Sequence, residues 1–302
     1  MKKFSNKILV VVFLVLVALF VGSKVLLAPA RESNLDADAL AVDTASLASI
    51  IFYNHKDSGD VMLEKNNGSW TVSRNGKHFR ARESTVSSFV SALAGLHPQR
   101  IASRKKEKWD DYQVGDTSAI KVSLQDQNGD DATTFFFGKE TGGHTFVRTA
   151  DGDEVFVVEG YLRQKADKGF NEWRDPALLR LNKDLITKIT FEYPADSGFV
   201  VEKNPSWKIG GTKADSTAVE NYLRQLRSKD HREYADTFTP GRNPDVTVTF
   251  TGDKEETVIK GWNTAFYEWV INSSHQPDVY FLDKTMALPG SLFIGKNKLV
   301  GK

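Results

Sequence analysis

The sequence predicts an α+β protein in which an N-terminal transmembrane helix precedes two tandem repeats of an antiparallel sheet with one packed helix. Three observations lead to this prediction. An apolar run follows a basic start, landmark residues recur in the same order in two parts of the chain, and each part changes from helical to strand periodicity. With 302 residues, of which 40% are hydrophobic, the chain is long enough for more than one core.

The N-terminal segment has the features of a membrane anchor. Residues 1–7 are basic, and residues 8–28 are mostly apolar and close to the ~20 residues that a helix needs to cross a bilayer. Positive charge before the span predicts a cytoplasmic N-terminus, so we expect a single-pass protein of the cell inner membrane with its soluble part in the periplasm. A cleavable signal ending near Ala28-Pro29-Ala30 is the alternative, but the proline and the length of the apolar run favour an uncleaved anchor. Residues 29–46 are polar and are predicted to be a tether.

The remaining sequence contains an internal repeat. Asp57-Ser58-Gly59 recurs as Asp196-Ser197-Gly198, 139 residues later, and Trp70 and Trp207 follow at corresponding places. Residues at helical spacing predict one amphipathic helix in each repeat: Val86, Phe89, Val90 and Leu93 in the first, and Val219, Tyr222, Leu223 and Leu226 in the second. Alternating apolar residues after each helix predict about four antiparallel strands. Each repeat is therefore expected to contain a strand, a strand with tryptophan, the helix and these further strands.

These patterns also give the expected domain boundaries. The first repeat covers residues 47–162 and the second covers residues 183–302. The segment between them, 163–182, carries Trp173 and several leucines, so we expect an ordered connector rather than a flexible linker. The matched positions of Trp70 and Trp207 favour two core residues over the alternative, two stacking platforms for a sugar.

Composition and motifs argue against several kinds of chemistry. Forty lysines and arginines balance 39 acidic residues, which disfavours a nucleic-acid partner, and the chain has no cysteine for disulfides, thiolate metal sites or nucleophilic catalysis. The six histidines show no metal-ligand spacing, and the sequence contains no phosphate-binding loop or nucleophile elbow. Residues 126–131 depart from the spacing of a calcium loop and are better explained as a hairpin turn. We therefore expect no enzymatic activity, no cofactor and no metal site.

Two groups of residues are candidates for contact with a partner. An aromatic group in the second repeat is predicted to form an exposed patch, and it consists of Trp262, Phe266, Tyr267 and Trp269. A basic group follows the first helix, and its candidate contact residues are Arg104, Lys105 and Lys106. The basic group is typical of a solvated face, and the alternative is contact with anionic headgroups or an acidic partner. Exposed sheet edges are a third predicted docking surface, through strand pairing.

Several motifs, taken in order, resemble those of the domain-of-unknown-function 4340 family of bacterial proteins. They include Trp70, the segments 108–114, 145–148 and 155–158, and Trp173-Arg174-Asp175, within a similarity that covers roughly residues 47–290. The resemblance implies a membrane-anchored protein of the Gram-negative cell envelope, associated with the ATPase, permease and periplasmic subunits of a gliding-motility-type ABC transporter. It supplies no catalytic residue, because the motifs are structural.

Two functional hypotheses follow. The first is a non-enzymatic accessory or scaffold subunit of an ABC-type transport or gliding-motility-type complex, with the permease and periplasmic subunits as partners. The second is a periplasmic solute- or glycan-binding module. A concave polar pocket lined by aromatic residues would favour the second hypothesis.

Overall fold

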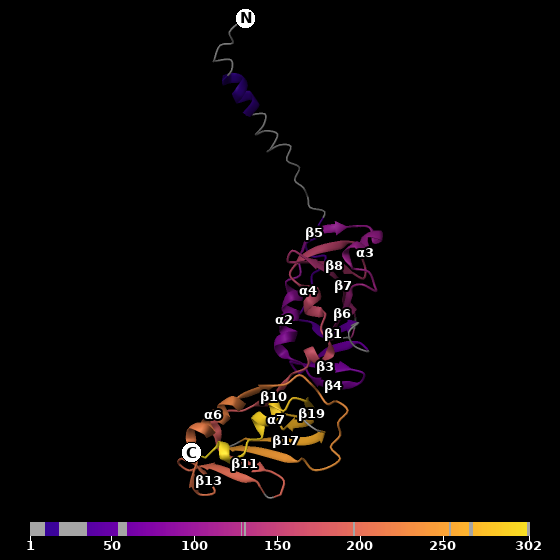
Figure 1. Ribbon diagram of the computed structural model, residues 1–302. Coiled ribbons are helices and arrows are strands. Elements are labelled where there is room, and N and C mark those ends of the chain that lie inside the picture. The colour runs from indigo at the N-terminus through magenta and orange to yellow at the C-terminus, as the bar shows by residue number, and fades with distance from the viewer. Residues whose placement is uncertain are drawn as a thin grey trace. The chain divides into compact units, whose positions relative to one another are not determined.

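The computed structural model describes residues 10–17, 35–53, 59–127, 129, 131–195, 197–253, 255–265 and 268–300 (Figure 1). Antiparallel strands dominate this part of the chain, and the helices are few and short. Two large antiparallel sheets account for most of the strands, as the predicted fold class requires.

The first sheet contains nine strands among the described residues, in the order β4-β3-β2-β1-β6-β7-β8-β9-β5. Its strands are β1 (Leu47–Tyr53), β2 (Val61–Asn66), β3 (Ser69–Arg74), β4 (Lys77–Arg80), β5 (Pro98–Ser103), β6 (Ile120–Asp126), β7 (Asp131–Thr141), β8 (His144–Thr149) and β9 (Val155–Glu159). The helices within this part of the chain are α2 (Glu83–Ala94), α3 (Trp109–Tyr112) and α4 (Leu162–Ala166).

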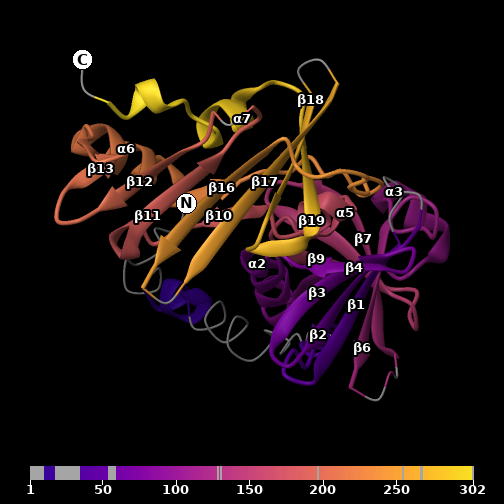
Figure 2. The ribbon, with the colours of Figure 1, turned by 90° about the horizontal axis from the view of Figure 1, so that it is seen from below.

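The second sheet contains eight strands in the described part of the chain, in the order β14-β13-β12-β11-β16-β17-β18-β19. Its strands are β11 (Ile186–Glu192), β12 (Phe199–Lys203), β13 (Trp207–Ile209), β14 (Thr212–Lys213), β16 (Val246–Gly252), β17 (Glu256–Ala265), β18 (Glu268–Ser273) and β19 (Gln276–Asp283). The α-helices in this part of the chain are α5 (Phe170–Trp173), α6 (Ser216–Leu226) and α7 (Ala287–Leu292). A separate pair of strands is formed by β10 (Ala177–Arg180) and β15 (Ser228–Asp230), and short 3-10 helices lie at Lys106–Lys108, Lys183–Leu185 and Lys296–Lys298. Figure 2 shows α6 beside β12 and β13.

The two sheets have the same topology. Eight strands of the first sheet and the eight of the second follow one another in the same spatial order, which confirms the predicted tandem sheets. The tryptophans occupy equivalent places in register, because Trp70 of β3 pairs with Lys65 of β2 and Trp207 of β13 pairs with Lys203 of β12. Both indoles are buried, at 8% and 2% exposure, as expected for core residues.

The sequence underestimates the number of strands before each helix. Four strands, rather than two, precede α2, because tight turns at Asn67-Gly68 and Asn75-Gly76 separate β2, β3 and β4. All four of these turn residues have positive φ angles, between 50° and 83°, as in the type I′ turns that asparagine-glycine pairs favour. The same position in the second sheet, between β13 and β14, uses Gly210-Gly211, also at positive φ.

The chain forms two compact units. Residues 1–47 and 89–167 make up the first, and residues 48–88 and 168–302 make up the second. One apolar cluster of the first unit contains Val114, Phe146, Val155 and Val157. The core of the second unit joins the predicted apolar face of α6 to β11, β16 and β17, and Phe79 of β4 packs against this same core. The second unit therefore contains β1–β4 in addition to the whole second sheet.

Much of the N-terminal region falls outside the described residues, including most of the predicted span 8–28. Residues 10–17 form a helix whose apolar side chains are all exposed. In the described part of the chain, no helix is both long enough and apolar enough to cross a bilayer. Leu40, which the sequence assigned to the tether, is only 1% exposed, so ordered packing begins before residue 47.

Candidate functional site

Trp262 does not belong to an exposed patch. Its side chain is 4% exposed, and its indole N–H donates to the carbonyl oxygen of Arg242 at 3.1 Å. The rings of Phe238 and Tyr280 lie 5.6 and 6.0 Å from it. The prediction of an exposed Trp262 is therefore wrong, because an aromatic cluster formed by segments distant in sequence covers this residue.

The other aromatic candidates differ from one another. Trp269 is half-buried and packs against the second core, with its ring 5.7 Å from that of Phe293. Its indole nitrogen is buried without a hydrogen-bond partner among the described residues. Phe266 and Tyr267 lie outside the described residues.

The predicted basic group lies on the surface of the first unit. Arg104, Lys105 and Lys106 are exposed, but Arg104 forms an ion pair with Glu154 at 2.7 Å. The Lys106 ammonium lies 4.9 Å from the centre of the Trp109 ring. These contacts fit the solvated face that the sequence favoured, with part of the basic charge compensated locally.

Three of the sheet edges are bridged by neighbouring segments or have features that oppose the addition of another strand. Tyr234 bridges to Phe281 on the outer side of β19, and the connector bridges to Ala81 directly after β4. Strand β5, at the end of the first sheet, begins with Pro98 and carries two register shifts. Proline, charged residues and bulges oppose pairing with a further strand, so β5 is poorly suited to docking by strand addition.

No pattern in the sequence predicted the polar group that surrounds Arg174 in the second unit. The Arg174 side chain is 1% exposed and lies between two aromatic rings, 3.7 Å from the centre of Phe79 and 3.5 Å from that of Tyr234. Its Nη1 donates to both carboxylate oxygens of Asp236, at 2.9 and 2.7 Å. Burial lowers the pKa of Arg174 from its ordinary value, while the hydrogen bond to Asp236 opposes this effect.

Backbone hydrogen bonds hold the connector against the end of β4. The Arg82 N–H donates to the carbonyl oxygen of Trp173 at 2.7 Å, and the Asp175 N–H donates to that of Arg80 at 2.9 Å. On the other side, the Gln276 side chain donates to the carbonyl oxygen of Ala177 at 2.6 Å. These hydrogen bonds hold residues 173–177 of the connector in place.

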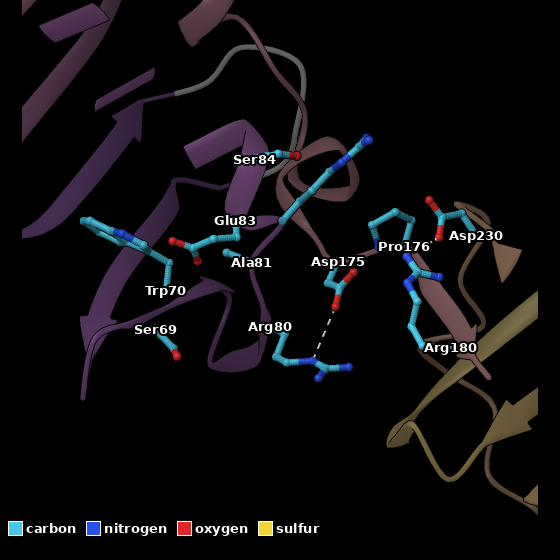
Figure 3. Close-up of a pocket in the computed structure, with 11 residues that line it drawn as sticks. Ser69, Trp70, Arg80, Ala81, Glu83, Ser84, Asp175, Pro176, Arg180 and Asp230 are labelled. Atoms are coloured by element: carbon cyan, nitrogen blue, oxygen red, sulfur yellow. Dashed lines mark hydrogen bonds and ion pairs between the residues drawn. The ribbon is translucent and has the colours of Figure 1, made fainter. Parts of the chain in front are cut away.

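A pocket of about 410 Å³ lies next to the connector within the second unit (Figure 3). We call it the arginine pocket, because three of its lining residues are Arg80, Arg82 and Arg180, at the end of β4, the start of α2 and the end of β10. The other lining residues are Ser69, Trp70, Ala81, Glu83, Ser84, Asp175, Pro176 and Asp230.

Two of the three arginines are held by carboxylates. Arg80 Nε lies 3.4 Å from Asp175 Oδ2, the contact drawn as a dashed line in Figure 3, and Arg80 also donates to the carbonyl oxygen of His275 at 3.2 Å. Arg180 pairs with Asp230 at 2.5 Å. These contacts fix two guanidinium groups at the rim of the arginine pocket.

The second unit also contains His275, in a neighbouring pocket of about 370 Å³ that includes His78 and Asp278. Burial and the nearby charge of Arg80 lower the pKa of His275 from its ordinary value. Within the described ranges, no three histidine, aspartate or glutamate side chains are arranged to hold a metal ion.

The comparisons with known proteins identify one relationship. The model of a domain of unknown function, DUF4340, matches residues 70–249, which are more than half of the chain. No curated protein and no solved structure matches the chain. The matched region runs from Trp70 through the connector, the Arg174 group and most of the arginine pocket to β16. The chain is therefore a member of the DUF4340 family.

Proposed function

We propose that the protein is a non-enzymatic accessory or scaffold subunit, anchored in the inner membrane by residues 8–28, with its two sheets in the periplasm. The observation that carries this proposal is the way the connector is fixed within the second unit. Arg174 is enclosed by Phe79, Tyr234 and Asp236, and so β4, the connector and the chain before β16 form one packed structure. A scaffold needs such fixed geometry, because it presents its surfaces to a partner in one orientation.

The proposed anchor is supported by the exposed apolar residues 10–17 and by the basic residues that precede them. The proposed partners are the permease and periplasmic subunits of an ABC-type transport or gliding-motility-type complex. The choice of these partners rests on the family resemblance. Two of the predicted contact surfaces do not add support, because Trp262 is buried and β5 has features that oppose strand pairing.

Crosslinking in native membranes tests the proposal. The full chain is crosslinked in intact cells, purified from solubilised membranes, and its partners are identified by mass spectrometry. We expect permease or periplasmic transporter subunits to be crosslinked to the folded part of the chain. Recovery of the chain without any such subunit, together with specific binding of a solute or glycan, would contradict the scaffold role and support the binding-module hypothesis.

A further inference from the structure

A short loop covers the buried Trp262 in the second unit. We call residues 237–244, which precede β16, the lid. The ring of Phe238 lies 5.6 Å from that of Trp262 and 5.4 Å from that of Tyr280. The Arg242 carbonyl oxygen accepts the Trp262 indole N–H at 3.1 Å. The lid therefore provides Trp262 with both an aromatic neighbour and a hydrogen-bond acceptor.

Both ends of the lid are fixed to the rest of the unit. Asp236, directly before the lid, is paired with the buried Arg174 at 2.7 Å. Directly after the lid, the Asp245 N–H donates to the carbonyl oxygen of Gly261 at 2.8 Å, and the Asp245 carboxylate accepts the Asn263 N–H at 2.7 Å. Movement of the lid therefore requires no change in the packing around Arg174 or in the strand pairing of the sheet.

The lid itself has few attachments. Phe238 and the last lid residue are partly buried, and the others are exposed. Within the described ranges, the N–H of Phe238 is the one lid amide with a hydrogen-bond partner, the carbonyl oxygen of Ala235 at 2.9 Å. The exposed side chain of Arg242 donates to the carbonyl oxygen of Asn263 at 2.9 Å and pairs with Asp245. Segments with few buried contacts and solvent-exposed amides open locally while the core stays folded, so we expect the lid to open before the sheet unfolds.

The groups under the lid are suited to binding a peptide. Opening exposes the rings of Trp262 and Tyr280, which lie 6.0 Å apart, and frees the indole N–H. In the closed lid, the ring of Phe238 and a backbone carbonyl group satisfy these groups, and any peptide with an aromatic residue offers the same two features. Tryptophan and tyrosine are also among the residues that contribute most to binding energy at protein interfaces.

We propose that the lid is an autoinhibitory cover, and that Phe238 holds the place of an aromatic side chain from an extended segment of a partner protein. Binding of that segment requires the lid to open, so the lid lowers the apparent affinity for any partner until it is displaced. The proposal goes beyond the scaffold role and rests on the contacts of the lid alone, so its tests need no transporter subunit.

Hydrogen exchange of the tryptophan indoles, measured by NMR on the full chain in detergent, tests whether the lid opens. The Trp207 indole N–H is the comparison, because Trp207 is 2% exposed and donates to Glu220 at 3.0 Å but has no lid. We expect Trp262 exchange to be independent of denaturant below the unfolding transition. Phe238→Ala should accelerate Trp262 exchange at least about 10-fold and leave Trp207 exchange unchanged, because the ring contacts that hold the lid closed are lost. Exchange of Trp262 only through global unfolding would overturn the proposal.

A peptide with the lid sequence tests the binding site. The probe is residues 235–245 with blocked ends, and calorimetry measures its binding to the full chain in detergent. We expect Phe238→Ala to bind the probe at least about 10-fold more tightly than the wild type, and a probe with alanine in place of its phenylalanine to show no such gain.

Phe199→Ala is the matched control for this experiment. It removes another partly buried ring of the same unit, which stacks on Phe191 at 4.3 Å, and it should bind the probe as the wild type does. Unfolding midpoints of the variants establish that each is folded. Equal affinity of folded Phe238→Ala and wild type for the probe would show that Phe238 does not occupy a binding site.

Discussion

At the scale of single residues, the two repeats use the same tryptophan with different partners. The indole N–H of Trp207 donates to Glu220 at 3.0 Å, whereas the residue at the matching position of the first helix is Ser87. Trp70 and Trp207 fill equivalent places in their sheets. Their burial indicates that each acts through packing rather than as a contact surface.

Replacing Trp207 by alanine is expected to lower the free energy of unfolding by about 3–5 kcal/mol, because the substitution empties a buried aromatic site. Chemical denaturation of the full chain measures this loss. Lys208→Ala, at the exposed neighbouring position, is the control and should change stability little. An unchanged unfolding free energy in Trp207→Ala, accompanied by loss of partner or solute binding, would instead identify Trp207 as a contact residue.

Glu220 makes part of the stability dependent on pH. The hydrogen bond from Trp207 lowers the pKa of Glu220 below its ordinary value of 4.5, so the ionised carboxylate favours the folded state. This contribution is fully present above pH 4.5 and is lost as the pH falls through the lowered pKa. Glu220→Gln keeps a hydrogen-bond acceptor for Trp207 but does not titrate. The unfolding midpoint of this variant should therefore fall less than that of the wild type when the pH is lowered from neutral to below 4.5. An identical decrease in both proteins would show that Glu220 does not contribute.

At the scale of elements, local signals in the sequence predicted more than long-range ones. The helical spacing that begins at Val86 and at Val219 located α2 and α6, and the tryptophan positions located β3 and β13. The Asn75-Gly76 pair is also a local signal, because it favours the tight turn that separates β3 from β4.

Contacts between distant segments explain what the sequence did not predict. Arg174 is surrounded by Phe79, Tyr234 and Asp236, which are far from it in sequence and follow no periodic pattern. The burial of Trp262 likewise depends on Phe238, in an irregular segment. The arginine pocket is lined by residues of several separate segments, so it could be found only from the structure.

Removing Asp236 from the Arg174–Asp236 pair is expected to cost more stability than removing Arg174. Asp236→Ala leaves an unpaired charge on Arg174, which is 1% exposed, and is expected to cost about 3–5 kcal/mol. Arg174→Met should cost less, because methionine fills the space between the two rings and Asp236 keeps 27% of its side chain exposed. Denaturation of both variants makes the comparison. A larger loss in Arg174→Met would mean that ring stacking matters more than charge pairing.

Two glycines, one in each sheet, are expected to be sensitive to substitution. A Cβ atom on Gly138 would overlap the carbonyl oxygen of Tyr112, and one on Gly261 would lie 2.7 Å from the Phe293 ring. Alanine at either position should destabilise by about 1–3 kcal/mol, and more at Gly138, where the backbone must move. Gly241→Ala is the control, since no described residue other than its chain neighbours comes within 4 Å of its Cβ position. Thermal unfolding with equal midpoints for all three variants would refute this comparison.

At the scale of the whole molecule, the proposed function requires a membrane anchor in addition to the two sheets of the same topology. The sheets are part of the structure, whereas most of the anchor lies outside the described residues and is inferred from the sequence. The scaffold proposal depends on this anchor, because a chain released into the periplasm would not be held beside a membrane transporter.

Membrane fractionation of cells that express the full chain tests this central claim most directly. We predict that the full chain stays in the inner membrane after a carbonate wash and that its folded part is accessible to protease only from the periplasm. A variant with Leu14→Arg and Leu16→Arg should be lost from the membrane fraction, since charges in the middle of a span cost about 2.5–3.5 kcal/mol each. Recovery of the wild type as a soluble periplasmic chain that begins near Arg31 would contradict the account.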